Sequence, residues 1–216
     1  MMRKAICSLI AAGAALALAA PAAADAPASA REIFDAGRCI VDSDRRAAVG
    51  LISSLPIDGD AASLSSLPDR VRSRCAEGLA SADVLHLRGA IAQALFFRDF
   101  GGIGIQPQRS VPLVDLDLPV QASPAGDRTV ELYRWADCLV RNDGPRAERL
   151  LASPVGSRAE AAAIDRMRDY MAACAPPEAQ LAVQPSELRS LLAQSAYHSM
   201  YRYWTGGLDG VRGRSD

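Results

Sequence analysis

The chain has 216 residues, with 25 acidic and 24 basic side chains, so its formal net charge is −1 at neutral pH. A near-neutral chain of mixed charge gives no electrostatic basis for binding nucleic acid or an anionic membrane surface. Its length is enough to bury one core or two small ones.

Residues 1–24 have the pattern of a secretory signal peptide. Arg3 and Lys4 form a positive start, an uncharged Ala/Leu-rich stretch follows, and Ala22-Ala23-Ala24 supplies the small residues of a cleavage site. No other stretch approaches the roughly 18 apolar residues that a membrane span needs. We therefore expect a periplasmic or secreted protein that is not inserted in the membrane after cleavage. An uncleaved anchor is the alternative.

Four helices are predicted after this segment. The first begins at a capping box of Ser29 and Glu32 and stops at the break from Asp42 to Asp44, and the second ends before Pro56. The third starts near Pro68 and runs through Leu79, and the fourth is capped by Ser81 or Asp83. The fourth helix has an apolar stripe at helical spacing, made of Val84, Leu87, Ile91 and Leu95.

The stretch that follows reads as a connection. GGIG, residues 101–104, lacks the frame of a phosphate-binding loop and indicates a helix C-cap and turn. VPLVDLDLPV, residues 111–120, alternates apolar and acidic residues between two prolines, which allows an edge strand or an extended strap at most.

Four more helices are then predicted. The first starts at Asp127 or Thr129, and the second is capped by Asn142 or Asp143 and has Pro145 in its first turn. The third begins at a capping box of Ser157 and Glu160 and runs to about Ala173, and the last begins at Pro185. The Gly-rich, charged end, residues 205–216, is expected to be disordered.

Two parts of the chain resemble each other. RCIVDSDRRAAVGLI at 38–52 matches DCLVRNDGPRAERLL at 137–151 with an offset of 99, and LRGAIAQALF at 87–96 matches LRSLLAQSAY at 188–197 with an offset of 101. We infer an all-α fold of two tandem four-helix modules produced by internal duplication. Module 1 covers residues 25–100, an extended Pro/Gly-containing connector covers 101–126, and module 2 covers 127–204.

The cysteines repeat with the helices. Cys39 and Cys75 are 36 positions apart, and so are Cys138 and Cys174. Four cysteines allow three connectivities, and the equal spacing favours one disulfide within each module, Cys39–Cys75 and Cys138–Cys174. Neither the cysteines nor the two histidines have the short spacing typical of zinc sites, so no metal and no cofactor is expected.

Four polar residues recur in both copies: Arg88 and Gln93 correspond to Arg189 and Gln194. The favoured interpretation is structural, with each arginine bound to a carboxylate or a helix carbonyl and each glutamine bound to backbone between helices. The alternative is two equivalent polar pockets, one in each module.

Aromatic residues gather at the end of the last helix: Tyr197, Tyr201, Tyr203 and Trp204. Packing within the protein is the favoured role, and an exposed partner surface is the alternative. His86 and His198 do not occupy equivalent positions in the repeat, so we expect surface or boundary histidines rather than general bases.

These patterns favour a non-catalytic, exported binding or interaction module. Its partner is not identified by the sequence, and another periplasmic protein is one candidate. The alternative is a hydrolase-type enzyme with a site in the cleft between modules, for which Arg88, Arg189, Asp44 and Asp143 are the candidates. A pocket that gathers carboxylates of raised pKa would favour the enzyme.

Overall fold

A computed structural model describes residues 29–53, 62–79, 84–105, 124–175 and 183–205. Every regular element in these ranges is a helix, which confirms the all-α prediction. The helices are α1 (Ala30–Ser43), α2 (Arg45–Ile52), α3 (Ala62–Ser65), α4 (Asp69–Cys75), α5 (Val84–Phe100), α6 (Pro124–Asn142), α7 (Gly144–Ala152), α8 (Arg158–Cys174) and α9 (Pro185–Thr205).

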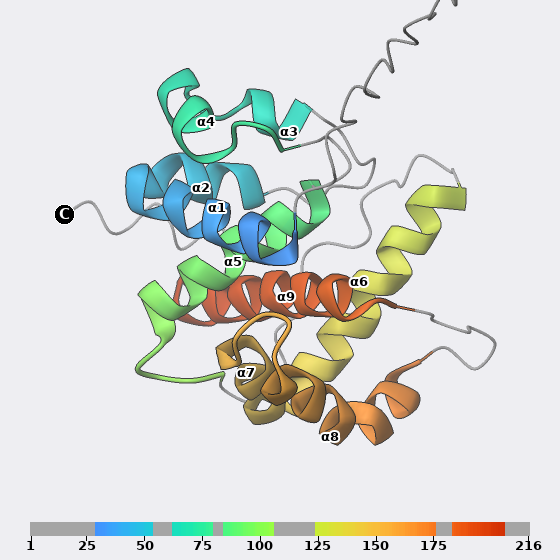
Figure 1. Cartoon of the computed structure of the whole chain (residues 1–216). Helices are drawn as coiled ribbons and strands as arrows, with labels where there is room; N and C mark the ends of the chain where they lie inside the picture. Colours follow the sequence, from blue (N-terminus) through green and yellow to red (C-terminus); the bar gives the residue numbers. More distant parts are fainter. Residues whose placement is uncertain (1–28, 54–61, 80–83, 106–123, 176–182, 206–216) are drawn as a thin grey trace, which may run out of the picture.

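Helices α5 and α9 lie side by side at the centre of the molecule (Figure 1). A helix that is buried on all sides is expected to be apolar all round, and both helices are mostly apolar or small, with Arg88, Gln93, Arg189 and Gln194 as buried polar exceptions. In α5 every residue from Leu87 to Gln93 is buried, and in α9 so is every residue from Leu188 to Tyr197. The remaining helices pack around this pair.

The two central helices approach closely at Gly89. A Cβ added to Gly89 would lie 2.3 Å from both the Cα and the Cβ of Ser190. Ser190 turns its hydroxyl back to the carbonyl of Ser186 at 2.8 Å, which satisfies that polar group inside its own helix. The crossing therefore depends on glycine at one position and a small residue at the other.

Helices α1 and α2 cover one side of the central pair, and α4 packs on α1 (Figure 1). The Ser29–Glu32 capping box forms as predicted, and Asp44 ends α1 and caps α2 through the N–H of Ala47. Helix α1 lies close against α5, where a Cβ on Gly37 would be 2.6 Å from the Cβ of Ala90.

Helices α6, α7 and α8 cover the other side, where α6 packs against α9 and α8 packs against α7 (Figure 1). Asp143 caps α7 through the N–H of Arg146, and Pro145 lies in the first turn, as predicted. The GGIG stretch forms a turn after α5, in which Gly104 has a φ of 73°. The turn brings Ile105 against Gly144 at the start of α7.

Both predicted disulfides are present. Cys39 is bonded to Cys75, which joins α1 to the end of α4, and Cys138 is bonded to Cys174, which joins α6 to the end of α8. Two disulfides fit an extracellular or otherwise oxidising compartment. In the ranges described above, no helix is both long and apolar enough to span a membrane.

Some helix boundaries were predicted wrongly. Helix α4 ends at Cys75 rather than near Leu79, because the chain turns through Gly78, which has a φ of 81°. Helix α6 begins at Pro124, ahead of the capping residues expected at Asp127 or Thr129. The short helix α3 was not predicted, and it lies between the helix end expected before Pro56 and the start expected near Pro68.

Several predictions fall outside the described residues. They concern the signal peptide at 1–24, the caps at Ser81 and Asp83, the strap at 111–120 and the tail beyond Thr205. These stay predictions.

Candidate functional site

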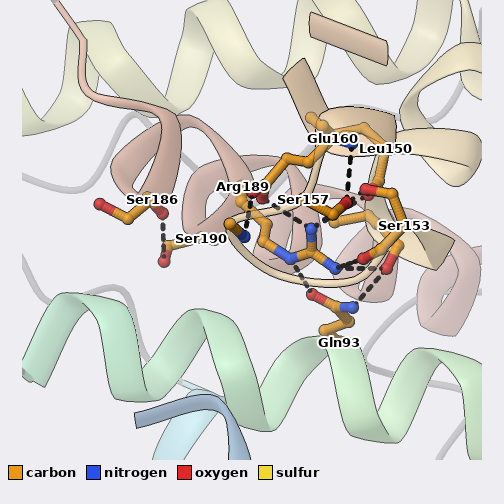
Figure 2. Close-up of polar contacts among 10 residues, drawn as sticks. Gln93, Leu150, Ser153, Ser157, Glu160, Ser186, Arg189 and Ser190 are labelled. Carbon is orange, nitrogen blue, oxygen red and sulfur yellow. Dashed lines mark hydrogen bonds and ion pairs between the residues drawn. The ribbon is translucent and has the colours of Figure 1, made fainter. Parts of the chain in front are cut away.

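Arg189 is the centre of a buried hydrogen-bond network between α9, α5 and the turn that joins α7 to α8 (Figure 2). Its Nε donates to Gln93 Oε1 at 2.9 Å, its Nη1 to Glu160 Oε1 at 2.8 Å, and its Nη2 to the carbonyl oxygen of Leu151 at 2.6 Å. The carbonyl oxygens of Leu150 and Ser153 accept the remaining donors, at 3.1 and 2.7 Å. All five guanidinium N–H groups are thus used inside the protein.

Glu160 is the charge that balances Arg189. The two residues are only 6% and 5% exposed. Burial lowers the pKa of Arg189, and the hydrogen bond and charge of Glu160 oppose that shift. The other carboxylate oxygen of Glu160 accepts from Gly156 N at 2.6 Å, while Ser157 caps the helix. The ion pair therefore fixes the turn from Ser153 to Ser157.

Arg88 occupies the corresponding place in the repeat and is 1% exposed. Its Nη1 donates to the carbonyl oxygen of Leu51, and its guanidinium also interacts with the Tyr133 hydroxyl. That hydroxyl donates to Gln194 Oε1 at 2.7 Å. Burial raises the pKa of Tyr133 to about 12, so the phenol stays protonated and remains a donor.

The structure therefore brings Arg189 and Gln93 together, and it links Arg88 to Gln194 through Tyr133. Gln93 also donates from Nε2 to the carbonyl oxygen of Leu151. These bonds to helix carbonyls and to Glu160 match the structural interpretation of the repeated polar residues. Their role in a functional site stays a prediction.

Two partners in these networks were missed by the sequence analysis. Glu160 was predicted only as part of a capping box. Its carboxylate accepts a hydrogen bond from the N–H of Gly156 rather than from the N–H of the N-cap residue Ser157. Tyr133 had no sequence signal, because the residue 99 positions before it, Phe34, has no hydroxyl group.

A cavity of about 780 Å³ opens beside the Arg189 network. It is bounded by α1, α5 and the end of α7 with the turn that follows, and Arg189 lies in its wall. The lining residues are Phe34, Arg38, Val41, Asp42, Gln93, Ala94, Phe97, Arg98, Leu151, Ala152, Ser153, Pro154, Val155 and Arg189. This volume falls within the range of pockets that hold small organic molecules.

The cavity lining combines apolar and polar side chains. Phe34, Phe97, Val41 and Val155 supply apolar surface. Ser153, which also lines it, uses its hydroxyl to donate to the carbonyl oxygen of Leu150 at 2.6 Å. Such a lining suits a ligand with an apolar body.

Comparisons with known proteins give no name to this site. No family model, curated protein or solved structure matches the chain. Among the described residues, no group of three or more His, Cys, Asp or Glu side chains could hold a metal ion. The geometry of the cavity is therefore the basis for a functional proposal.

The other candidate residues lie elsewhere. Asp44 and Asp143 cap α2 and α7. Tyr197 is buried at 2% exposure and stacks on Tyr201 with ring centroids 5.8 Å apart, so it packs inside the protein. Trp204 is 51% exposed. The side chain of Tyr203 lies outside the described set.

His198 is half-buried, and no described group makes a hydrogen bond with its solvent-shielded Nε2. Burial lowers the pKa of His198 to about 4, and the positive charges of Arg88 and Arg202 add to the shift. Asp137 shows the opposite behaviour, because burial raises its pKa to about 6 although Arg141 Nε donates to it at 2.7 Å.

These shifts predict opposing effects of pH on stability. As pH falls from about 6.5 to 4, His198 takes up a proton in the unfolded chain before it does so in the folded protein. Protonation therefore favours the unfolded state in this range, and the protein loses stability. Asp137 favours the folded state at low pH, and that contribution is lost as pH rises through about 6.

We expect His198→Gln to remove one of the two effects. When the pH is lowered from 7.5 to 4.5, the free energy of unfolding of the variant should fall by about 2 kcal/mol less than that of the wild type. This follows from about 1.4 kcal/mol per pKa unit. Urea unfolding of both proteins at the two pH values measures the difference. An identical pH dependence would contradict a depressed histidine pKa.

Proposed function

We propose that this chain is an exported, periplasmic protein with a non-catalytic binding function, and that the cavity beside Arg189 is its ligand site. The signal-peptide pattern of residues 1–24 supports export, and the two disulfides fit that compartment. The observation that carries the binding function is the cavity of about 780 Å³, formed between the α1/α5 face and the end of α7 with the turn that follows.

We further propose that the two sides of the protein are duplicated modules, residues 25–100 and 127–204, joined by the connector at 101–126. Equivalent hydrogen bonds support this origin: Arg88 donates to the carbonyl of Leu51, and Arg189 donates to the carbonyl of Leu150. The two acceptors, Leu51 and Leu150, are 99 positions apart, and the two donors, Arg88 and Arg189, are 101 positions apart, as in the matching stretches of sequence. Both disulfides also close segments of equal length.

The lining of the cavity supports binding over hydrolysis. Its carboxylate, Asp42, lies 3.9 Å from Arg98, and its hydroxyl, on Ser153, is bonded to a carbonyl. Among the described lining residues there is no histidine or cysteine to act as base or nucleophile. The raised pKa of a carboxyl group that would favour an enzyme occurs at Asp137, which is not in the lining.

The test uses N-phenyl-1-naphthylamine, a neutral apolar probe whose fluorescence rises when water is excluded. We expect saturable binding of one probe per protein with micromolar affinity, typical of an apolar pocket that lacks specific polar contacts. Phe97→Asp should weaken binding at least about tenfold, because it places a charge in the apolar wall.

Trp204→Gln is the matched control, because Trp204 is an exposed aromatic residue outside the lining. It should leave the affinity unchanged. Circular dichroism of each variant checks that the fold is retained. Non-saturable binding, or equal loss in both variants, would overturn the assignment of the cavity.

A further inference from the structure

The charges in the cavity wall do not balance. Among the described residues, three arginines and one aspartate line it: Arg38, Arg98, Arg189 and Asp42. Arg189 has every donor engaged and is paired with Glu160. Arg98 donates to the carbonyl of Val41 at 3.2 Å and lies 3.9 Å from Asp42.

Arg38 is the arginine left over. Within the part of the chain that the structure describes, no carboxylate forms an ion pair with Arg38, and its side chain is exposed. As far as the described residues are concerned, its hydrogen-bond donors face solvent and are available to a ligand. A guanidinium presents these donors in a planar fork that fits a carboxylate or sulfonate.

The position of Arg38 on α1 places it among the apolar residues of the cavity. Phe34, Arg38, Val41 and Asp42 follow one another at helical spacing and share the face of α1 that lines the cavity. A molecule resting on Phe34 and Phe97 would thus have its polar end within reach of Arg38. Asp42, one turn further on, would repel a second negative charge.

We propose that the ligand of this cavity is an organic monoanion, with its acidic group paired to Arg38 and its apolar body packed between Phe34 and Phe97. This inference rests on the proposed binding function and adds the charge and shape of the ligand. A neutral ligand would leave the donors of Arg38 to solvent and gain nothing from its charge. A dianion would place its second charge near Asp42.

A pair of probes tests the charge alone. 8-Anilinonaphthalene-1-sulfonate has the same ring system as N-phenyl-1-naphthylamine and adds one sulfonate. We expect the sulfonate probe to bind about tenfold more tightly at low salt, as a charge-assisted hydrogen bond allows. The advantage should shrink at higher ionic strength, because Arg38 is exposed and its charge is screened.

Arg38→Gln should abolish the advantage of the sulfonate probe while leaving the affinity for the neutral probe within about twofold. The control is Arg46→Gln, which removes an exposed arginine of α2 outside the lining and should change neither affinity. Competition between the two probes shows that they share one site.

The outcomes separate the two proposals. If the neutral probe binds and Phe97→Asp abolishes binding, but the sulfonate probe has no advantage or Arg38→Gln has no effect, the monoanion is wrong and the binding cavity stands. If neither probe binds to the folded wild-type protein at a single site, both proposals are overturned.

Discussion

Replacing Gly89 with alanine is expected to lower the free energy of unfolding by about 2–3 kcal/mol, a loss typical of overpacking in a close-packed interior. The new Cβ would lie 2.3 Å from the Cα and Cβ of Ser190, so α5 and α9 would have to separate along the core. The higher helix propensity of alanine, worth about 1 kcal/mol, is too small to compensate. Urea unfolding measures the change.

Gly50→Ala is the matched control for this experiment. Gly50 lies on the exposed side of α2, and a Cβ there would have no atom within 4 Å. The substitution should stabilise the protein by about 0.5–1 kcal/mol through helix propensity alone. Opposite signs for the two variants confirm the close approach of α5 and α9, whereas stabilisation by both would contradict it.

Arg189→Met is expected to cost about 3–5 kcal/mol, because it leaves Glu160 charged and buried without its partner. It also removes the donor to the carbonyl oxygen of Ser153 and leaves the carbonyl oxygen of Leu151 with Gln93 as its donor. Thermal or urea unfolding at neutral pH gives the loss. Arg189→Lys should recover only part of it, since an ammonium group cannot serve all of these acceptors.

The double variant Arg189→Met with Glu160→Met separates charge burial from packing. Removing both charges should recover a large part of the loss, as replacing buried ion pairs with apolar residues often does. A coupling energy near zero in this double-mutant cycle would contradict a strong buried pair between the two residues.

Local signals in the sequence predicted much of the helical fold. Ser29 with Glu32, Asp44 and Asp143 each cap the helix expected, because capping depends on residues within one turn of each other. The disulfide pairing followed from equal spacing. The end of α4 was missed because the apolar pattern continues to Leu79, whereas the helix ends at Cys75. The chain then turns through Gly78, which has a positive φ.

The candidate site was less predictable. The similarity between the two stretches of sequence pointed to Arg189 and Gln93. It did not show that Arg189, from the second stretch, would donate a hydrogen bond to Gln93, from the first. The cavity depends on how the turn at Ser153 lies against α1 and α5, which is a long-range arrangement without a local pattern. Likewise, only the positions of its neighbours in space show that no described carboxylate pairs with Arg38.

The crossed pairing of residues makes each half of the protein dependent on the other. Gln93 accepts a hydrogen bond from Arg189, Tyr133 contacts the guanidinium of Arg88, and Ser190 packs directly against Gly89. In this respect the two sides resemble the subunits of an obligate dimer, because each supplies side chains that the interior of the other needs.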